Sequence, residues 1–331
     1  MRTNKKSLSP HSLELDMNLA VQNIGDRLRH ILSTDLRRRG FIVALSGGID
    51  SSVSAALCVK AIGTERVYGL LLPETDSSAA STERGEQIAM HLGINYEVID
   101  IAPTLTAIGC YEKRDAAIRD IFPNYGSGWA NKIAIKGGID GRLNHFLLIV
   151  QSPDGQLFEE RLPLKEYLTI VAATNFKQRI RKTLEYFHAD RMNYAVVGTP
   201  NRLEYDQGFF VKNGDGSADV KPIAHLYKTQ VYALASHLGL PKEICSAAPT
   251  TDTYSLEQGQ DEFYFALPYG EMDLALWALN NRYSAAELAR ALTIDEEKAE
   301  WIFRDISNKR NTTKYLHATG VLVEDVPEIE F

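Results

Sequence analysis

FIVALSGGIDSSVSAALCVKAIG, residues 41–63, joins a buried strand to a helix through a glycine turn. The apolar run at its start stops abruptly at Gly47 and Gly48, which is typical of a buried parallel strand that enters a tight turn. The residues that follow have helical character and end at Gly63, a common position for closing a helix. A strand that feeds a helix in this way is half of a βαβ unit, so the stretch favours the α/β class.

The same alternation extends on both sides of this stretch. We expect an amphipathic helix over residues 13–39, strands at 67–73 and 94–101 and a helix at 81–93, followed later by a helix at 175–191, a strand at 194–200 and a helix at 226–239. Right-handed crossovers would make this a doubly wound, mostly parallel sheet flanked by helices. We therefore predict one domain over residues 13–331 with a helical C-terminal extension, preceded by a polar tail at residues 1–12.

Residues 110–164 interrupt the alternation. They contain the glycine-rich stretches GSGWANK and KGGIDGR, then HFLLIVQSPDGQLFEERL, whose central turn residues indicate an antiparallel hairpin. We interpret them as a subregion inserted within the domain. Two roles remain open for it: a peripheral hairpin without chemistry, or a segment that reshapes a substrate or dimer surface.

Composition excludes several classes of protein. The 331 residues are 44% hydrophobic and 24% charged, as in a globular protein, and the net charge of −7 argues against a general nucleic-acid binder. The three cysteines, Cys58, Cys110 and Cys245, have no spacing that suggests a zinc site or disulfides. No secretory signal and no apolar run long enough to cross a bilayer is evident, so we expect a cytoplasmic protein with no membrane partner.

The turn SGGIDSS, residues 46–52, is suited to binding phosphate. Two glycines let the backbone approach a ligand, and the loop amides and the helix N-terminus offer hydrogen-bond donors. Serine hydroxyls could add donors and Asp50 could hold Mg²⁺ against the phosphates. The Walker A lysine is absent. The alternative is a tight turn in which Ser and Asp only cap a helix.

A second polar segment spans VGTPNRLE (197–204), GFFVKNGDGSADVKPI (208–223) and LYKTQV (226–231). It combines a threonine at a strand end, carboxylates, lysines and an acidic glycine-rich loop. Lysines can neutralise phosphate charge, and carboxylates can hold Mg²⁺ or sugar hydroxyls. The spacing does not match a calcium-binding loop, and an isolated lysine or acidic turn could equally be a solvated surface feature.

These motifs together resemble one family. SGGIDSS resembles the pyrophosphate-binding loop of the N-type ATP pyrophosphatases, and the second segment resembles the ammonia-dependent NAD synthetase family within that superfamily. The resemblance covers residues 41–103 and 170–275 and continues weakly to about residue 312. NFKQRIR (175–181), PTTD (249–252) and NKR (308–310) resemble further family motifs. It implies an adenine nucleotide alpha-hydrolase-like fold.

The resemblance also implies a reaction. ATP and deamido-NAD bind with Mg²⁺, the nicotinate carboxylate attacks the α-phosphorus, and pyrophosphate leaves. Ammonia then attacks the acyl-adenylate to give NAD and AMP, which makes the enzyme a ligase that forms a carbon–nitrogen bond. Catalysis would come from alignment and charge neutralisation, since no enzyme nucleophile is needed.

The roles of individual residues are carried over by the same resemblance. The expected ATP contacts are Ser46, Gly47, Gly48, Asp50, Ser51, Ser52, Thr199, Lys228 and Thr250; the magnesium ligands are Asp50 and Glu204; the deamido-NAD contacts are Arg179, Lys212, Asp219 and Lys309; and the catalytic set is Asp50, Asp215 and Lys228. Asp215 would lie close to the reacting carboxylate or ammonia. For the lysines the alternative is a solvated surface charge, and for Arg179 an ion pair on its helix.

Several positions depart from the family pattern. Ala247 and Ala248 replace a usual Lys-Glu, Asn308 replaces a usual His, and the insertion is foreign to the compact members. These departures favour a sister ATP-dependent amide synthetase with another carboxylate; a catalytically silent nucleotide-binding protein is a further alternative. The chain has no room for an amidase domain, so we expect free ammonia or ammonia from a separate glutaminase. A homodimer is expected from the resemblance alone.

Overall fold

The computed structural model describes residues 7–136, 145–246, 254–256, 267–324 and 326–327. Thr250, together with the rest of the PTTD segment, lies outside the described residues. The described helices are α1 (Met17–His30), α2 (Ile49–Ile62), α3 (Ala79–Leu92), α4 (Ala102–Ala107), α5 (Cys110–Arg119), α6 (Leu164–Met192), α7 (Arg202–Gln207), α8 (Lys228–His237), α9 (Lys242–Cys245), α11 (Tyr269–Asn280), α12 (Ala285–Leu292) and α13 (Glu296–His317).

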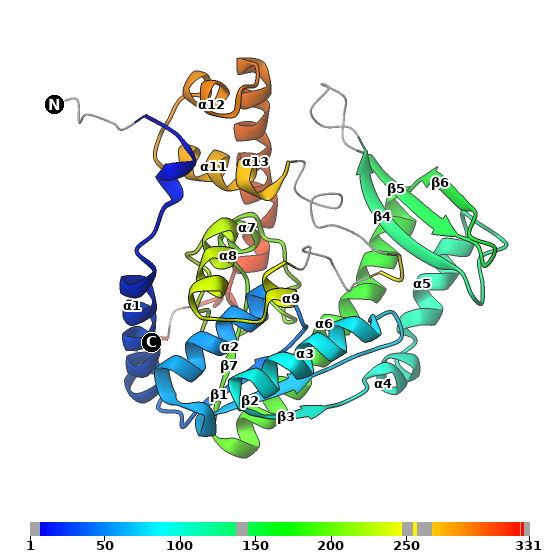
Figure 1. Ribbon diagram of the computed structural model, residues 1–331. Coiled ribbons are helices and arrows are strands. Elements are labelled where there is room, and N and C mark those ends of the chain that lie inside the picture. Colours follow the sequence, from blue (N-terminus) through cyan, green and yellow to red (C-terminus); the bar gives the residue numbers. More distant parts are fainter. Residues whose placement is uncertain (1–6, 137–144, 247–253, 257–266, 325, 328–331) are drawn as a thin grey trace.

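A parallel sheet lies in the lower part of the molecule in the view of Figure 1. Within the described ranges its strands lie in the order β3 (Asn95–Val98), β2 (Val67–Leu71), β1 (Phe41–Ala44) and β7 (Ala195–Val197). The chain builds β2 and β3 on one side of β1 and returns to the other side for β7. The strand order therefore reverses at β1, and in open α/β sheets ligands bind at the carboxyl ends of strands at such a point.

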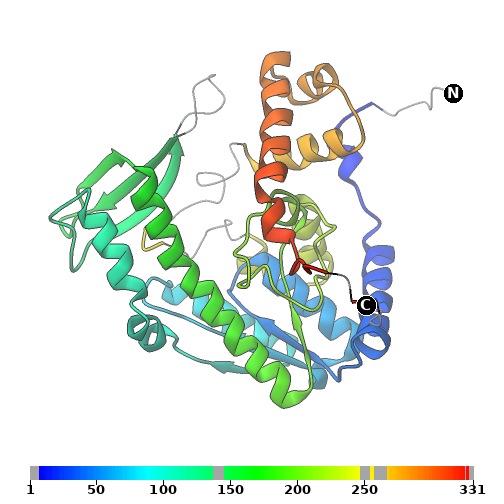
Figure 2. The same ribbon diagram turned by 180° about the vertical axis from the view of Figure 1, so that it is seen from behind.

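Alternate residues of β1 enter different hydrophobic cores. Phe41 and Val43 pack with α1, α2 and α8, whereas Ile42 packs with α6 on the opposite face. Figures 1 and 2 show α2 and α3 on one face of the sheet and the long helix α6 on the other. This two-sided cover explains why the strand reads as a continuous apolar run, and it confirms the predicted doubly wound class.

Local signals set the helix ends. Gly63, with φ of 85°, follows α2, and Asn193, with φ of 55°, follows α6. The helix expected over residues 13–39 is shorter than predicted. Asp16 accepts a hydrogen bond from the Leu19 amide and starts α1 there, and the helix widens into a π-turn at Ile31–Asp35 before it ends.

The inserted residues form a separate antiparallel sheet in the order β4 (Ala130–Lys136), β5 (His145–Gln151) and β6 (Leu157–Arg161). The predicted hairpin corresponds to β5 and β6; β4 escaped sequence reasoning because its residues mix lysine with apolar types. The sheet packs against α5 and α6. Its buried residues Ile133 and Leu148 share a hydrophobic core with Tyr254, which lies much later in the sequence, between α9 and α11. The insertion is therefore joined to the rest by a common core.

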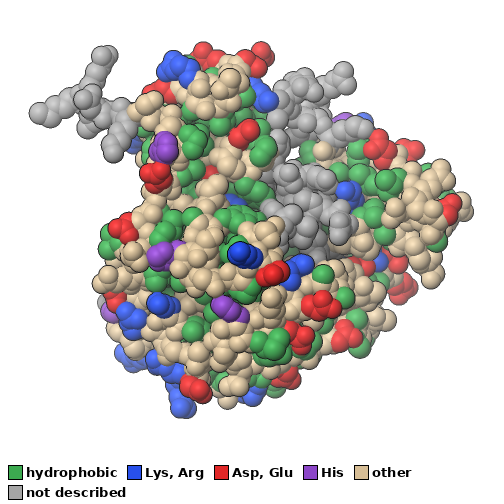
Figure 3. Space-filling view, in the orientation of Figure 1, with side chains coloured by type: hydrophobic (Ala, Val, Ile, Leu, Met, Phe, Trp, Pro, Cys, Tyr) green, Lys and Arg blue, Asp and Glu red, His purple; other side chains and the backbone are tan. Residues whose placement is uncertain are grey.

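The C-terminal helices α11, α12 and α13 form a further core, closed by Leu8 and Leu13 from the N-terminal segment and by Leu203 of α7. No helix in the described ranges is long and apolar enough to span a membrane. On the face in Figure 3, acidic and basic side chains are interspersed. That face is thus of mixed charge, as is usual for a solvent-exposed surface.

Candidate active site

The glycine turn connects β1 to α2 at the carboxyl end of the strand. Gly47 has φ of 73°, and a Cβ atom there would collide with the carbonyl oxygen of Ser81 in α3. Arg84 Nε also donates to the Gly47 carbonyl oxygen over 3.2 Å. Only glycine fits this position, because both the backbone angle and the neighbouring helix exclude a side chain.

Serine hydroxyls fix the shape of the turn. Ser51 Oγ donates to the Gly48 carbonyl oxygen over 3.0 Å and Ser52 Oγ to the same atom over 2.8 Å. Ser46 Oγ lies 3.2 Å from Ser51 Oγ and accepts a hydrogen bond from the Gly48 amide over 3.3 Å. The turn is therefore ordered by its own side chains at the N-terminus of α2, where the helix dipole favours an anion.

Asp50, in the first turn of α2, meets residues from distant parts of the chain. One carboxylate oxygen forms an ion pair with Lys228 Nζ at the start of α8. The other accepts a hydrogen bond from Asn201 Nδ2 over 3.2 Å. Lys228 is only 1% exposed and the Asp50 side chain 16% exposed, so the lysine is buried and the carboxylate is partly buried. No motif in the sequence pointed to Asn201 as a member of this group.

Glu204 completes this group. Its carboxylate accepts a hydrogen bond from the Asn201 backbone amide over 3.1 Å, and Asn201 Oδ1 accepts one from the Glu204 backbone amide over 3.2 Å, which forms a capping box at the start of α7. Burial, and next the nearby Asp50 carboxylate, raise the pKa of Glu204 to about 8. Burial disfavours the charged form of Lys228, but the carboxylates of Asp50 and Glu204 outweigh it and raise the Lys228 pKa.

Asp50 and Glu204 could hold a divalent cation. No cluster of three or more His, Cys, Asp or Glu suited to a metal occurs among the described residues. A cation at these two carboxylates would need oxygen ligands from phosphate or water, and Mg²⁺ is commonly bound in this way. The raised pKa of Glu204 fits such a site: burial and the Asp50 charge destabilise the ionised carboxylate, and a bound cation would stabilise it.

The acidic loop predicted between α7 and α8 packs beside the same edge of the sheet. Gly198 follows β7, and a Cβ there would lie 2.7 Å from the Cβ of Ala218 in the loop, so the two segments are in close contact. Asp215 Oδ1 accepts a hydrogen bond from the Val211 amide over 2.7 Å, and burial raises the Asp215 pKa. Thr199, half-buried, lies between Gly198 and Asn201 at this edge.

Among the four residues expected to contact a dinucleotide, Arg179 and Lys212 lie together. Arg179 Nε donates to the Lys212 carbonyl oxygen over 3.3 Å. Lys212 Nζ donates to the carbonyl oxygens of Tyr315 and Ala318, each over 2.8 Å, and lies 4.1 Å from the centre of the Tyr315 ring. Lys212 therefore ties the acidic loop to the end of α13.

The other two have local partners. Asp219 accepts from the Val196 amide over 2.7 Å and from the Tyr186 hydroxyl over 3.2 Å. Lys309 Nζ forms an ion pair of 2.7 Å with Asp305, one turn earlier on α13. Asp219 thus supports the edge of β7, and Lys309 lies on the helix that Lys212 contacts.

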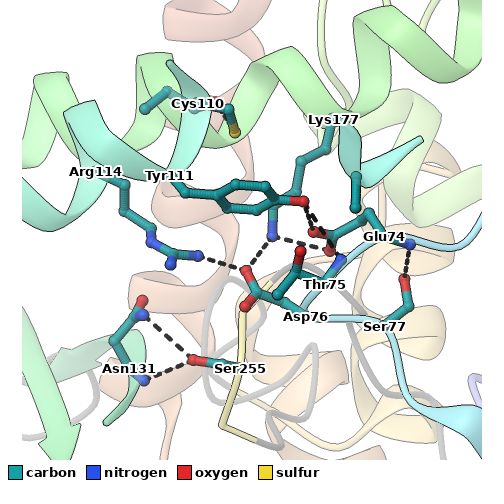
Figure 4. A network of polar contacts seen from close by, with 12 residues as sticks. Glu74, Thr75, Asp76, Ser77, Cys110, Tyr111, Arg114, Asn131, Lys177 and Ser255 are labelled. Atoms are coloured by element: carbon teal, nitrogen blue, oxygen red, sulfur yellow. Dashed lines mark hydrogen bonds and ion pairs between the residues drawn. The ribbon is translucent and has the colours of Figure 1, made fainter. Parts of the chain in front are cut away.

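A buried charge network that sequence reasoning missed lies at the end of β2 (Figure 4). Lys177 of α6 is paired with Asp76 over 2.5 Å and with Glu74 over 3.0 Å. Arg114 of α5 forms an ion pair with Asp76 from the other side, and Tyr111 donates to Glu74 over 2.8 Å. The connection between β2 and α3 is thereby fixed to α5 and α6. The spacing of these residues along the chain does not predict that they lie together.

Arg181, one helical turn beyond Lys177, binds the same connection. Its Nε donates to the Leu72 carbonyl oxygen over 3.1 Å. Arg181 therefore supports the loop that leads into α3, the helix that holds Gly47. The spacing of four residues between Lys177 and Arg181 on one helix was the sequence feature that could have predicted that both face the same side.

A glycine turn at a helix N-terminus, a buried lysine and two carboxylates lie together where the strand order reverses. This arrangement, on a parallel sheet covered by helices on both faces, defines a nucleotide-binding α/β protein of the adenine nucleotide alpha-hydrolase-like fold. A family model described as NAD synthase matches residues 20–121 and 151–315. The chain belongs to the NAD synthase family.

Relatives support this membership over most of the chain. The NH(3)-dependent NAD(+) synthetase of Rhizobium meliloti (strain 1021) is 54% identical over 99% of this chain and 98% of its own length. That of Mesorhizobium japonicum is 51% identical over 96% of this chain and 99% of its own. The enzyme of Thermotoga maritima is 37% identical over 73% of this chain and 80% of its own.

Solved structures share the fold at lower identity. An NH3-dependent NAD synthetase from Campylobacter jejuni superposes with a TM-score of 0.62 at 22% identity, over 94% of this chain and 100% of that one. An NMN synthetase from Francisella tularensis gives 0.64 at 21% identity, over 93% and 99%. At this identity the likeness concerns the fold alone.

Proposed function

We propose that this chain is an ammonia-dependent NAD synthetase that converts deamido-NAD to NAD and releases AMP and pyrophosphate. The ion pair between Asp50 and the buried Lys228, placed beside the buried Glu204 at the glycine turn, carries the proposal. A nucleotide-binding protein without catalysis has no need of two neighbouring carboxylates and a buried lysine beside its phosphate site. Relatives of that name match nearly the whole chain, which supports the choice of reaction.

The glycine turn would bind ATP. Ser46, Gly47, Gly48, Ser51 and Ser52 would surround the β- and γ-phosphates with amides and hydroxyls, since the turn already lies at a helix N-terminus. Thr199, at the end of β7, would add a contact from the neighbouring strand. Thr250 would bind ATP as well, on the strength of the sequence resemblance alone.

Charge neutralisation would come from Lys228 and a cation. Asp50 and Glu204 would hold Mg²⁺, which supplies positive charge where pyrophosphate develops negative charge. The Lys228 ammonium is held near these carboxylates and would stabilise the leaving pyrophosphate. A carboxylate cannot react directly with ammonia because oxide is a poor leaving group, whereas AMP leaves readily from an acyl-adenylate.

The dinucleotide would bind on the side of α6 and α13. Arg179 and Lys212 lie together there, and Lys309 lies on α13, so their positive charges would face the diphosphate of deamido-NAD. Asp219 would contact the same substrate. Asp215, half-buried in the acidic loop, would lie near the carboxylate or the incoming ammonia.

We further propose a homodimer in the cytoplasm that uses free ammonia or ammonia from a separate glutaminase. A second candidate differs only in the carboxylate substrate, and one fold relative is named as an NMN synthetase. The residues Ala247, Ala248 and Asn308, which depart from the family pattern, motivate that candidate.

A substrate competition separates the two. Purified protein is supplied with Mg·ATP, ammonium and an equimolar mixture of deamido-NAD and nicotinate mononucleotide, and each amide product is measured. We expect NAD as the main product, with one pyrophosphate for each NAD. Preferential amidation of the mononucleotide would favour the second candidate, and the absence of pyrophosphate release with either would exclude both.

A further inference from the structure

Helix α11, from the C-terminal extension, reaches the starting end of α8. Asp273 of α11 is completely buried, and both of its carboxylate oxygens are used there. Oδ1 accepts a hydrogen bond from the Lys228 amide over 3.2 Å, and Oδ2 accepts one from the Thr229 amide over 2.7 Å. A single side chain thus binds the first two amides of the helix that begins with Lys228.

The start of α8 lacks the usual kind of cap. Helix N-termini leave their first amides without partners, and a Ser, Thr, Asp or Asn just before the helix normally supplies an acceptor. Tyr227 occupies that position, and its side chain makes no such bond. Asp273 performs the task from another helix, so the position of α8 depends on how α11 packs against it.

Burial disfavours the ionised form of the Asp273 carboxylate. Burial raises the pKa of Asp273 to about 6, while the Thr229 and Lys228 amides act in the opposite direction. An asparagine or serine could accept a hydrogen bond without bringing a charge into the core. The charge that is present suits the positive end of the α8 dipole and the Lys228 ammonium close by.

The same helix also contacts the other end of Lys228. Tyr269 lies four residues before Asp273, on the same face of α11, and its ring centre is 5.5 Å from Lys228 Nζ. Tyr232 of α8 lies 6.0 Å from the same nitrogen. Lys228 is therefore constrained at its amide by Asp273 and along its side chain by aromatic rings, with its ammonium directed to Asp50.

We propose that Asp273 is a positioning residue for Lys228: it sets where α8 begins, and so places the lysine ammonium against Asp50 at the glycine turn. Asp273 touches no substrate in this account and acts only through Lys228. The inference rests on the function proposed for Lys228 and assigns the C-terminal helices a part in the reaction.

A double-mutant cycle tests it. Asp273→Asn keeps the shape but turns an amide NH₂ toward the helix amides, so we expect kcat to fall by about tenfold or more with a smaller change in KM for ATP. In a Lys228→Met background, the same Asp273→Asn change should have no further effect on kcat, because the group that it positions is gone. Asp273→Glu, which displaces the carboxylate, should also lower kcat.

A matched control separates positioning from simple helix capping. Asp295 caps α13 by accepting from the Lys298 amide over 2.7 Å, away from the glycine turn. Asp295→Ala, which removes that cap, should lower Tm as Asp273→Asn does but leave kcat within about twofold of the wild type. Rates are measured well below the Tm of every variant, so that loss of folded protein does not contribute.

Two outcomes overturn the proposal: wild-type kcat in Asp273→Asn, or losses from Asp273→Asn and Lys228→Met that simply add. The same cycle measured on the Kd of Mg·ATP needs no turnover and should show the same coupling between the two positions. Coupling in ATP binding by a protein that makes no NAD would support the role of Asp273 and reject the proposed function. Additive effects in a protein that makes NAD would support the proposed function and reject the role of Asp273.

Discussion

The surroundings of a single residue, Asp50, show how the site is assembled. Its carboxylate receives the Lys228 ammonium on one oxygen and the Asn201 amide on the other, and it lies close enough to Glu204 to raise the pKa of that group. Buried charges of this kind are tolerated only when partners surround them. The arrangement explains why residues far apart in the sequence form one site.

The resemblance to the family predicts that Asp50, Glu204 and Lys228 act at one site, and the structure brings these three residues together, but the sequence did not predict their contacts. Asn201 and Asp273 were missed, because a hydrogen bond from another helix leaves no periodic trace in the chain. The role of Thr250 rests on its motif, since it lies outside the described residues.

Gly47 gives a test at the residue scale. Gly47→Ala combines a strained positive φ with a collision against the Ser81 carbonyl oxygen, so the turn must move. We expect affinity for Mg·ATP to fall by about tenfold or more, measured by calorimetric titration. Gly239→Ala is the control: φ is 74° there, but no atom lies within 4 Å of the new Cβ. It should cost about 1–2 kcal/mol of stability and leave ATP affinity unchanged. Equal loss of affinity in both variants would contradict the account.

At the scale of elements, the buried network at the end of β2 joins parts that the sequence shows separately. Asp76 lies between Lys177 of α6 and Arg114 of α5 (Figure 4). Nearby, the Asn131 amide of β4 donates to the Ser255 hydroxyl, and the Asn131 carbonyl oxygen accepts from the Leu256 amide. The βαβ alternation predicted the strands and helices well, because buried parallel strands read as apolar runs. The inserted sheet was only partly predicted, since β4 lacks that signal.

The network predicts a dependence of stability on pH. Burial alone would raise the pKa of Asp76, but Lys177 and Arg114 outweigh it and hold that pKa below its usual range. The stabilisation is therefore complete above the unfolded-state pKa of about 3.9 and is lost as the pH falls through the lower folded-state value. We expect Asp76→Asn to lower the free energy of unfolding by about 3 kcal/mol at pH 7, and the gap to the wild type to begin to narrow below about pH 4 and to go on narrowing as the pH falls further.

Urea unfolding at a series of pH values measures this difference. Asp120→Asn, at an exposed position at the end of α5, is the control and should follow the wild type at every pH. A gap between Asp76→Asn and the wild type that stayed constant down to pH 3 would show that the effect is not electrostatic.

In the molecule as a whole, the parallel sheet, the inserted sheet and the C-terminal helices are joined by shared cores and hydrogen bonds. Tyr254, from the chain between α9 and α11, is buried in the core of the inserted sheet, and α11 caps the helix that carries Lys228. The family model leaves out residues 122–150, which contain β4 and most of β5. The sequence located this insertion but could not show that its core includes a residue more than a hundred positions away.

The shared core predicts that the insertion unfolds together with the rest. Ile133 of β4 is fully buried, so Ile133→Ala should lower the free energy of global unfolding by about 2–5 kcal/mol. Leu157→Ala on β6, where the side chain is 61% exposed, should have an effect below about 0.5 kcal/mol. Denaturant unfolding followed by tryptophan fluorescence and by circular dichroism should give a single transition. A separate early transition in Ile133→Ala would mean that the insertion is an independent unit.

Adenylation of the substrate carboxylate can be detected by following the carboxylate oxygen. Deamido-NAD labelled with oxygen-18 in the nicotinate carboxylate is converted in the presence of Mg·ATP and ammonium, and the products are examined by mass spectrometry. If the carboxylate attacks the α-phosphorus, AMP carries one labelled oxygen for each NAD formed and pyrophosphate carries none. Label in pyrophosphate or in inorganic phosphate, or formation of ADP in place of AMP, would contradict the account.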